Sequence, residues 1–366
     1  MSVKPILASS LIAKEEIGLF EERARKRLRV GTGCVAVDDA LDGGFVYGRD
    51  GIYNISGATR SQVTETVSFF SASVFLVYGI WRLEGRLKGK RGVRLMWPGL
   101  YHLHREISMM ISLQLLITHL LASASHNATL IDATGNLDVL KLYRSIITRL
   151  SNSNHDHEAN VKLATSTLDR VRIMRVFDFE GVVEGLNELI DELEGKNVPK
   201  NTIGDSQEEA EDEMLDVGSE EKVEEEKKEQ AGMVLINNLS QVLGLLLKNN
   251  YAQGQATLTT LVRRLRNTAK EHNLCIVLLS WSVTYGSDQE RVSIFESIKA
   301  RPGLGKSLGY LVDTQLLIDA IPRKAKGKGA ASDMVNVIEV IYSGGNHQVG
   351  KFGVFDITVD GEINPM

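Results

Sequence analysis

The 366-residue chain has no long apolar run and very little cysteine. No stretch of about 18 apolar residues is free of charge, so we expect no membrane-spanning helix. The first residues, M-S-V-K-P-I-L-A-S-S, lack the apolar region and cleavage pattern of a signal peptide. The two cysteines, Cys34 and Cys275, are far apart, which argues against a disulfide framework and against a zinc site. The sequence therefore predicts an intracellular, reduced protein without membrane contact.

Negative charge is concentrated in one segment. Positions 201–230 hold thirteen acidic residues against three lysines, which gives this segment a charge of −10 and leaves +5 for the rest. A charged stretch with few apolar residues is typical of disorder. We therefore expect a mildly basic body with an acidic disordered insertion over 196–231. The insertion is interpreted as a solvated loop, with partner docking or DNA mimicry as the alternative.

A short apolar strand enters a glycine turn in the sequence I-Y-N-I-S-G-A-T-R-S-Q-V-T, which begins at Ile52. In such a place P-loop NTPases carry G-x-x-x-x-G-K-[ST], whose backbone N–H groups and lysine bind phosphate. Gly57 and Thr64 fit this spacing, but Gln62 and Val63 replace the second glycine and the lysine. The stretch is either a degenerate nucleotide site or a strand and turn without a nucleotide role.

Apolar strands alternate with helices after residue 105. A helix is predicted over 10–29, and a buried helix over 106–123, which is apolar nearly all round. Strands are predicted over 128–131, 171–176, 233–236 and 274–279, and helices over 137–150, 179–193, 241–247 and 256–272. Three late strands are predicted over 313–321, 336–342 and 353–359. This alternation predicts an α/β fold, with a mostly parallel central sheet, helices on both faces and a C-terminal β-meander.

Five segments in this order resemble the RecA-type recombinase family, most closely its eukaryotic recombinase paralogues. They are T-G-C-V-A-V-D-D-A-L-D-G-G (32–44), A-T-L-I-D-A-T-G-N-L (128–137), M-V-L-I-N-N-L-S (233–240), L-V-R-R-L-R-N-T-A-K-E-H-N-L-C-I-V-L-L-S (261–280) and R-P-G-L-G-K-S-L-G-Y-L-V-D-T-Q-L-L-I (301–318). The resemblance covers roughly 30–195 and 231–360. It implies a RecA-like P-loop NTPase core over 30–360, preceded by a helix and basic linker over 1–29.

The resemblance implies four positions for ATPase chemistry, and each lacks the expected group. Val63 stands for the loop lysine, Thr134 for the carboxylate after the second core strand, Asn237 for the Walker B aspartate and Ser282 for the γ-phosphate sensor. Charge neutralisation and positioning supply nearly all catalysis of phosphoryl transfer. We therefore expect no catalytic residue, no metal site and no cofactor. Binding of ATP and Mg²⁺ without hydrolysis, through Gly57 and Arg60, is the alternative.

An atypical insertion within the core spans 63–105. In relatives the helix after the phosphate loop follows directly, whereas here about 40 residues stand between the loop and the helix over 106–123. The stretch shows no clean hydrophobic period. It is interpreted as a lineage-specific insertion with a basic arm, or as a gene-model error such as a retained intron.

Two loops after the third and fourth core strands contact DNA in the family, and they correspond here to about 248–255 and 285–310. The second contains the candidate DNA-binding residues Arg291, Lys299, Arg301 and Lys306. A predicted hairpin tip adds Arg323, Lys324 and Lys326, which are interpreted as DNA contacts or part of a nuclear import signal. Solvated loop charge is the alternative for each cluster.

Together these features imply a non-catalytic RecA-like recombinase paralogue in the nucleus, which assists homologous recombination and DNA double-strand break repair. The expected partners are other recombinase paralogues or the active recombinase, with weak binding of single-stranded or branched DNA. One alternative is an ATP-binding, DNA-dependent recombinase paralogue with divergent motifs. Another is a RecA-fold scaffold subunit of a tRNA-modifying complex.

Overall fold

The computed structural model describes residues 28–58, 99–135, 137–152, 156–196, 231–284, 291–323, 334–344, 348–358 and 363–366. The helix predicted over 10–29 lies outside these ranges except for its last residues. Five candidate site residues also lie outside them, namely Arg60, Val63, Thr64, Lys324 and Lys326. The insertion over 63–105 is described only from residue 99, and the acidic insertion only at its two ends.

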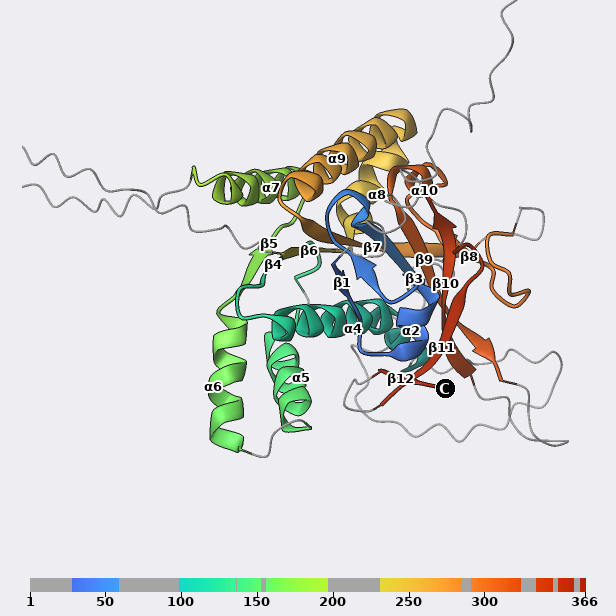
Figure 1. Ribbon diagram of the computed structural model, residues 1–366. Helices are drawn as coiled ribbons and strands as arrows, with labels where there is room; N and C mark the ends of the chain where they lie inside the picture. Colours follow the sequence, from blue (N-terminus) through green and yellow to red (C-terminus); the bar gives the residue numbers. More distant parts are fainter. Residues whose placement is uncertain are drawn as a thin grey trace, which may run out of the picture.

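A ten-stranded sheet forms the centre of the fold, with the order β12-β11-β10-β9-β3-β7-β6-β4-β5 and β8 paired to β7 (Figure 1). The strands are β3 (Ile52–Ala58), β4 (Asn127–Asp132), β5 (Val171–Arg175), β6 (Gly232–Asn237), β7 (Leu274–Thr284), β8 (Ala300–Pro302), β9 (Thr314–Pro322), β10 (Met334–Ser343), β11 (Phe352–Ile357) and β12 (Ile363–Pro365). Each neighbouring pair in the series β9-β3-β7-β6-β4-β5 is parallel. Strands β9 to β12 pair antiparallel. The predicted mostly parallel sheet with a C-terminal meander is confirmed.

Helices cover both faces of this sheet (Figure 1). The core of one face includes side chains of α2 (Val35–Ala40), α4 (Gly99–Ala122), α5 (Val139–Ser151) and α6 (His157–Leu168). The core of the other includes side chains of α7 (Phe179–Leu193), α8 (Leu239–Asn249), α9 (Tyr251–Glu271) and α10 (Ser307–Leu311). A small sheet of β1 (Arg29–Val30) and β2 (Phe45–Val46), followed by the short helix η2 (Gly48–Asp50), leads into β3.

The central strand β7 shows why the sheet needs helices on both faces. Cys275, Val277 and Leu279 face one core, whereas Ile276 and Leu278 face the other. All five are buried, as a continuous apolar strand requires. In the part of the chain that the structure describes, no helix is long and apolar enough to cross a bilayer.

A buried histidine joins the segment before β3 to α4 and β4. His119 is fully buried, with Nδ1 2.6 Å from the Tyr47 hydroxyl and Nε2 3.0 Å from the carbonyl oxygen of Asn127. Because a carbonyl only accepts, Nε2 carries the proton and Nδ1 accepts from Tyr47. Burial lowers the pKa of His119 to about 4; the bond to Asn127 opposes this change, and the charges of His126 and Arg170 reinforce it.

The structure departs from the predicted elements in three places. Residues 157–168 form α6, where the sequence predicts neither a helix nor a strand. The predicted DNA loop over 248–255 is wrong, because Asn250 alone separates α8 from α9. Its side chain caps α9 by accepting a hydrogen bond from the backbone N–H of Gln253. The predicted loop over 285–310 contains β8 and most of α10.

Candidate functional site

The carboxyl ends of the parallel strands meet at one edge of the sheet, which is where open α/β sheets bind ligands. The register places Asp132 of β4 beside Asn237 of β6, and Ala58 of β3 beside Ser282 of β7. The structure therefore brings Asn237 and Ser282 to this edge, together with Gly57 near the end of β3 and Thr134 after β4.

The hydrogen bonds at this edge converge on Asp132, which is fully buried. Oδ1 accepts hydrogen bonds from the Thr134 hydroxyl (2.7 Å), the Thr134 backbone N–H (3.0 Å) and Asn237 Nδ2 (2.9 Å). Oδ2 accepts from the backbone N–H of Leu137 (3.1 Å). Burial raises the pKa of Asp132, but these hydrogen bonds outweigh it and hold the pKa below its usual range. Asp132 is therefore an anion at neutral pH and a weak general base.

Asp132 and Asn237, as the structure holds them, do not fit a Mg²⁺ site. The metal requires oxygen ligands arranged in an octahedron, but four donors already take up the Asp132 carboxylate. Asn237 contributes an amide where a second carboxylate would be needed, and its Nδ2 points at Asp132 and at Thr134 Oγ1 (3.1 Å). Within the described ranges, no group of three or more His, Cys, Asp or Glu could hold a metal ion.

Beneath this edge, the central strands enclose a buried polar cluster that the sequence analysis missed. Asn54 Nδ2 donates to Ser280 Oγ (3.0 Å), and Asn54 Oδ1 accepts from Ser56 (2.8 Å) and Gln315 (3.3 Å). All four residues are buried. Two polar residues at alternate positions of an apolar strand, Asn54 and Ser56, were the available signal. The cluster cross-links β3, β7 and β9 below the site.

The candidate DNA-binding residues are spread over β8, α10 and their flanks. Arg291 pairs with the exposed Glu296 at 3.3 Å, and Lys299 and Lys306 are exposed. Arg301 lies on β8, and Arg323 directly follows β9. The structure thus places these residues but does not gather them into one loop.

The surface of α9, β8 and α10 has few carboxylates. The sequence contains no Asp or Glu over 239–270 or over 298–312, although α9 ends at Glu271 and Asp313 pairs with Arg266 of α9. Exposed tyrosines stand among its basic residues: Tyr251 begins α9 and Tyr310 lies on α10. Tyr310 is 75% exposed and Tyr251 is 62% exposed. Two hydrogen bonds of Gln255 join α9 to the segment that leads from β8 into α10. Gln255 donates to the carbonyl of Leu304 (3.0 Å) and accepts from the Ser307 hydroxyl.

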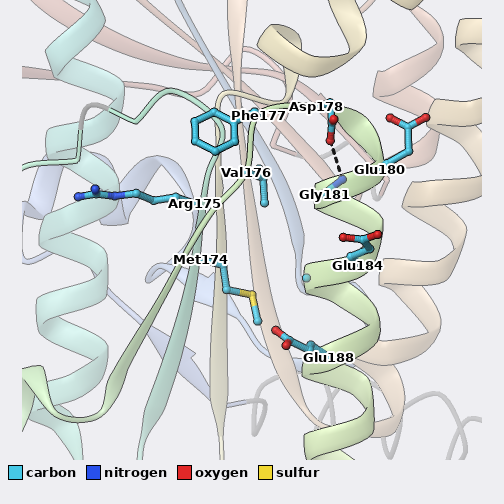
Figure 2. A pocket seen from close by; sticks show the side chains of 10 residues that line it. Met174, Arg175, Val176, Phe177, Asp178, Glu180, Gly181, Glu184 and Glu188 are labelled. Carbon is cyan, nitrogen blue, oxygen red and sulfur yellow. Dashed lines mark hydrogen bonds between the residues drawn. The ribbon is translucent and has the colours of Figure 1, made fainter.

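An acidic groove lies beside β5, the last strand at one side of the sheet, between β5 and α7 (Figure 2). Among the described strands, β5 pairs only with β4, so its outer edge is free. The cavity has a volume of about 590 Å³. Met174 points toward α7 (Figure 2), and Gly185 makes room for it, because a Cβ there would lie 3.1 Å from the methionine sulfur. Val176 adds to the apolar floor.

Carboxylates form the rim of the acidic groove, contributed by Asp178 and by Glu180, Glu184 and Glu188 along α7 (Figure 2). Asp178 caps α7 by accepting from the N–H of Gly181 at 2.8 Å. Phe177 stands at the mouth of the groove with 89% of its surface exposed. Sequence reasoning missed the groove, although the i, i+4 spacing of the three glutamates was visible.

Comparison with known proteins supports the fold. A solved structure described as the crystal structure of the RadB recombinase matches with a TM-score of 0.50 and 14% sequence identity. The alignment covers 92% of this chain and 99% of that chain. No family model and no curated protein matches the chain. At this identity the likeness concerns the fold, and the predicted RecA-like α/β core is confirmed.

Proposed function

We propose that this chain is a non-catalytic RecA-like recombinase paralogue that assists homologous recombination and double-strand break repair in the nucleus. The observation that supports this most is the chemistry of the carboxyl edge of the sheet. There, Asp132 is held by Thr134 and Asn237, where ATP hydrolysis would need a metal shell and a water-activating carboxylate. The likeness to a recombinase fold favours recombination as the process.

The chain acts through partners, and the acidic groove is the proposed contact surface. A free strand edge offers unpaired backbone groups to an extended segment of another protein. Arg172 already pairs with Glu188 (2.9 Å), so Glu180 and Glu184 are the rim carboxylates that favour a basic segment. The apolar floor formed by Met174 and Val176 accommodates one apolar side chain. The proposed partners are the active recombinase and other recombinase paralogues.

Weak DNA binding is proposed for the surface of α9, β8 and α10, where carboxylates are few. Lysine and arginine there would contact phosphates, so binding should weaken as salt rises. Exposed Tyr251 and Tyr310 would offer faces for base stacking, which suits single strands.

Two experiments test the proposal. The purified full-length chain should show no ATP turnover with or without single-stranded DNA, and turnover comparable to an active recombinase would refute the pseudo-ATPase assignment. In binding assays with the active recombinase and recombinase paralogues, Glu184→Lys should abolish the interaction. The control Glu158→Lys reverses an exposed charge on α6, a helix that contributes no residue to the groove lining, and should leave the interaction intact. Binding that Glu184→Lys leaves unchanged would place the partner surface elsewhere.

A further inference from the structure

We propose that Asp132 positions the acidic groove, so that this docking surface is formed without bound nucleotide or metal. The inference rests on the proposed partner role of the acidic groove. In this proposal the hydrogen bonds to Asp132 hold the segments that form the groove in their places.

The side chain of Asp132 ties three parts of the chain together. Through Asn237 it joins the end of β4 to the end of β6, and through Leu137 it fixes the start of the segment that enters α5. The two bonds from Thr134 close the turn in between. A second link runs along the backbone, because the N–H of Ala133 donates to the carbonyl of Asn237 at 3.2 Å.

The backbone of Asp132 carries this constraint to the groove. Its carbonyl oxygen accepts a hydrogen bond from the N–H of Val176 at 3.0 Å, directly after the last residue of β5. Val176 forms part of the floor of the acidic groove. Phe177 and the helix cap Asp178 follow immediately, so this bond sets where α7 begins. The side chain of Asp132 therefore accepts hydrogen bonds from Thr134 and Asn237 at the carboxyl edge of the sheet, while its backbone carbonyl accepts one from Val176 in the groove.

The hydrogen bonds to Asp132 are needed because no described cation neutralises its carboxylate. A buried charge without a counter-ion depends on its donors, and loss of one donor leaves part of the charge uncompensated. The turn it holds includes Gly135 at φ +66°, and among the described residues nothing lies within 4 Å of a Cβ built there. The contacts that the described residues make with this turn are therefore mainly the hydrogen bonds to Asp132. In an active enzyme a bound nucleotide would hold the strand ends at this edge in place; here the hydrogen bonds of Thr134 and Asn237 to Asp132 hold them.

Hydrogen exchange of the full-length chain tests the inference. Thr134→Val removes the hydroxyl that donates to Asp132 and accepts from Asn237 Nδ2, and it should speed exchange of the amides over 174–182 by at least ~10-fold. Thr134→Ser keeps the donor and should restore wild-type exchange. The matched control is Ser56→Ala, which removes a buried hydroxyl from the central polar cluster and should leave exchange over 174–182 unchanged. Adding ATP and Mg²⁺ to the wild-type chain should not change exchange over 174–182.

Three outcomes would overturn the inference. One is unchanged exchange over 174–182 in Thr134→Val, and another is the same acceleration there in Ser56→Ala, which would indicate only a general loss of stability. The third is protection of this segment by ATP and Mg²⁺. Should Thr134→Val fail to fold, Asn237→Ser removes a different donor and carries the same expectation. Failure of the wild-type chain to bind recombinases would refute the proposed function while leaving these exchange results interpretable.

Discussion

Acid should weaken the fold through His119, and the structure sets the direction and size of this effect. The folded pKa of about 4 lies below the ordinary value of 6.5, so the unfolded chain binds the proton more readily. The stabilisation is therefore complete above about pH 6.5 and is lost as the pH falls toward 4. Near pH 5 the cost should be about 2 kcal/mol, rising to about 3 kcal/mol near pH 4.

The variant that isolates this contribution is His119→Gln. A glutamine amide does not titrate, yet it offers one donor and one acceptor for Asn127 and Tyr47. Urea unfolding of both proteins at neutral pH and near pH 5 gives the difference. The wild type should lose about 2 kcal/mol more than the variant on acidification. The second variant, Tyr47→Phe, leaves His119 in place and should keep the wild-type pH dependence.

Equal pH dependence in wild type and His119→Gln would refute this reasoning. It would mean either that His119 is protonated in the folded protein or that acid opens the contact between α4 and β4 before unfolding. Titration of Asp132 does not account for a loss of stability near pH 5. Its folded pKa lies below its ordinary value, so its contribution is present at higher pH and is lost only in more acidic solution.

Three further predictions concern packing, an ion pair and DNA. Gly353→Ala should cost on the order of 3 kcal/mol or prevent folding, measured by thermal unfolding, because its Cβ would lie 2.2 Å from the carbonyl oxygen of Ala36. Asp313→Asn should cost about 1 kcal/mol in urea unfolding, since Arg266, its ion-pair partner at 2.8 Å, is partly exposed to solvent. Lys306→Ala should lower affinity for single-stranded DNA and reduce the slope of log K against log salt by about 1. An unchanged slope would remove Lys306 from the proposed surface.

The sequence allowed prediction of the elements whose burial is continuous or strictly periodic. Strands β4, β5, β6 and β7 and helices α5 and α7 lie close to their predicted positions, because apolar periodicity reflects burial directly. Helix α6 was missed because its buried side chains include Asn160 and Thr167, which give no apolar stripe. Strand β8 is short and exists through its antiparallel pairing with β7, which is a tertiary effect.

The junction of α8 and α9 shows how one residue type can be misread. Asn250 and Gly254 look like loop residues, yet Asn250 is a helix cap and Gly254 lies inside α9. A Cβ at Gly254 would lie 2.8 Å from a side-chain carbon of Leu247 and 3.0 Å from its backbone. The glycine therefore permits the close approach of α8 to α9. The sequence shows the glycine but not the neighbouring helix that requires it.

Four positions in the sequence lack an ATPase group, namely Val63, Thr134, Asn237 and Ser282, and Asp132 was not among the predicted site residues. In the structure the Thr134 hydroxyl donates a hydrogen bond to Asp132, two positions earlier. The signal was local, since an aspartate followed by a threonine two residues later is a common turn pair. What the sequence could not reveal is that Asn237, on a strand 105 positions away, donates to the same oxygen. Under the proposed non-catalytic role, Thr134 and Asn237 also have a structural task, because both donate to Asp132 and together hold the ends of β4 and β6.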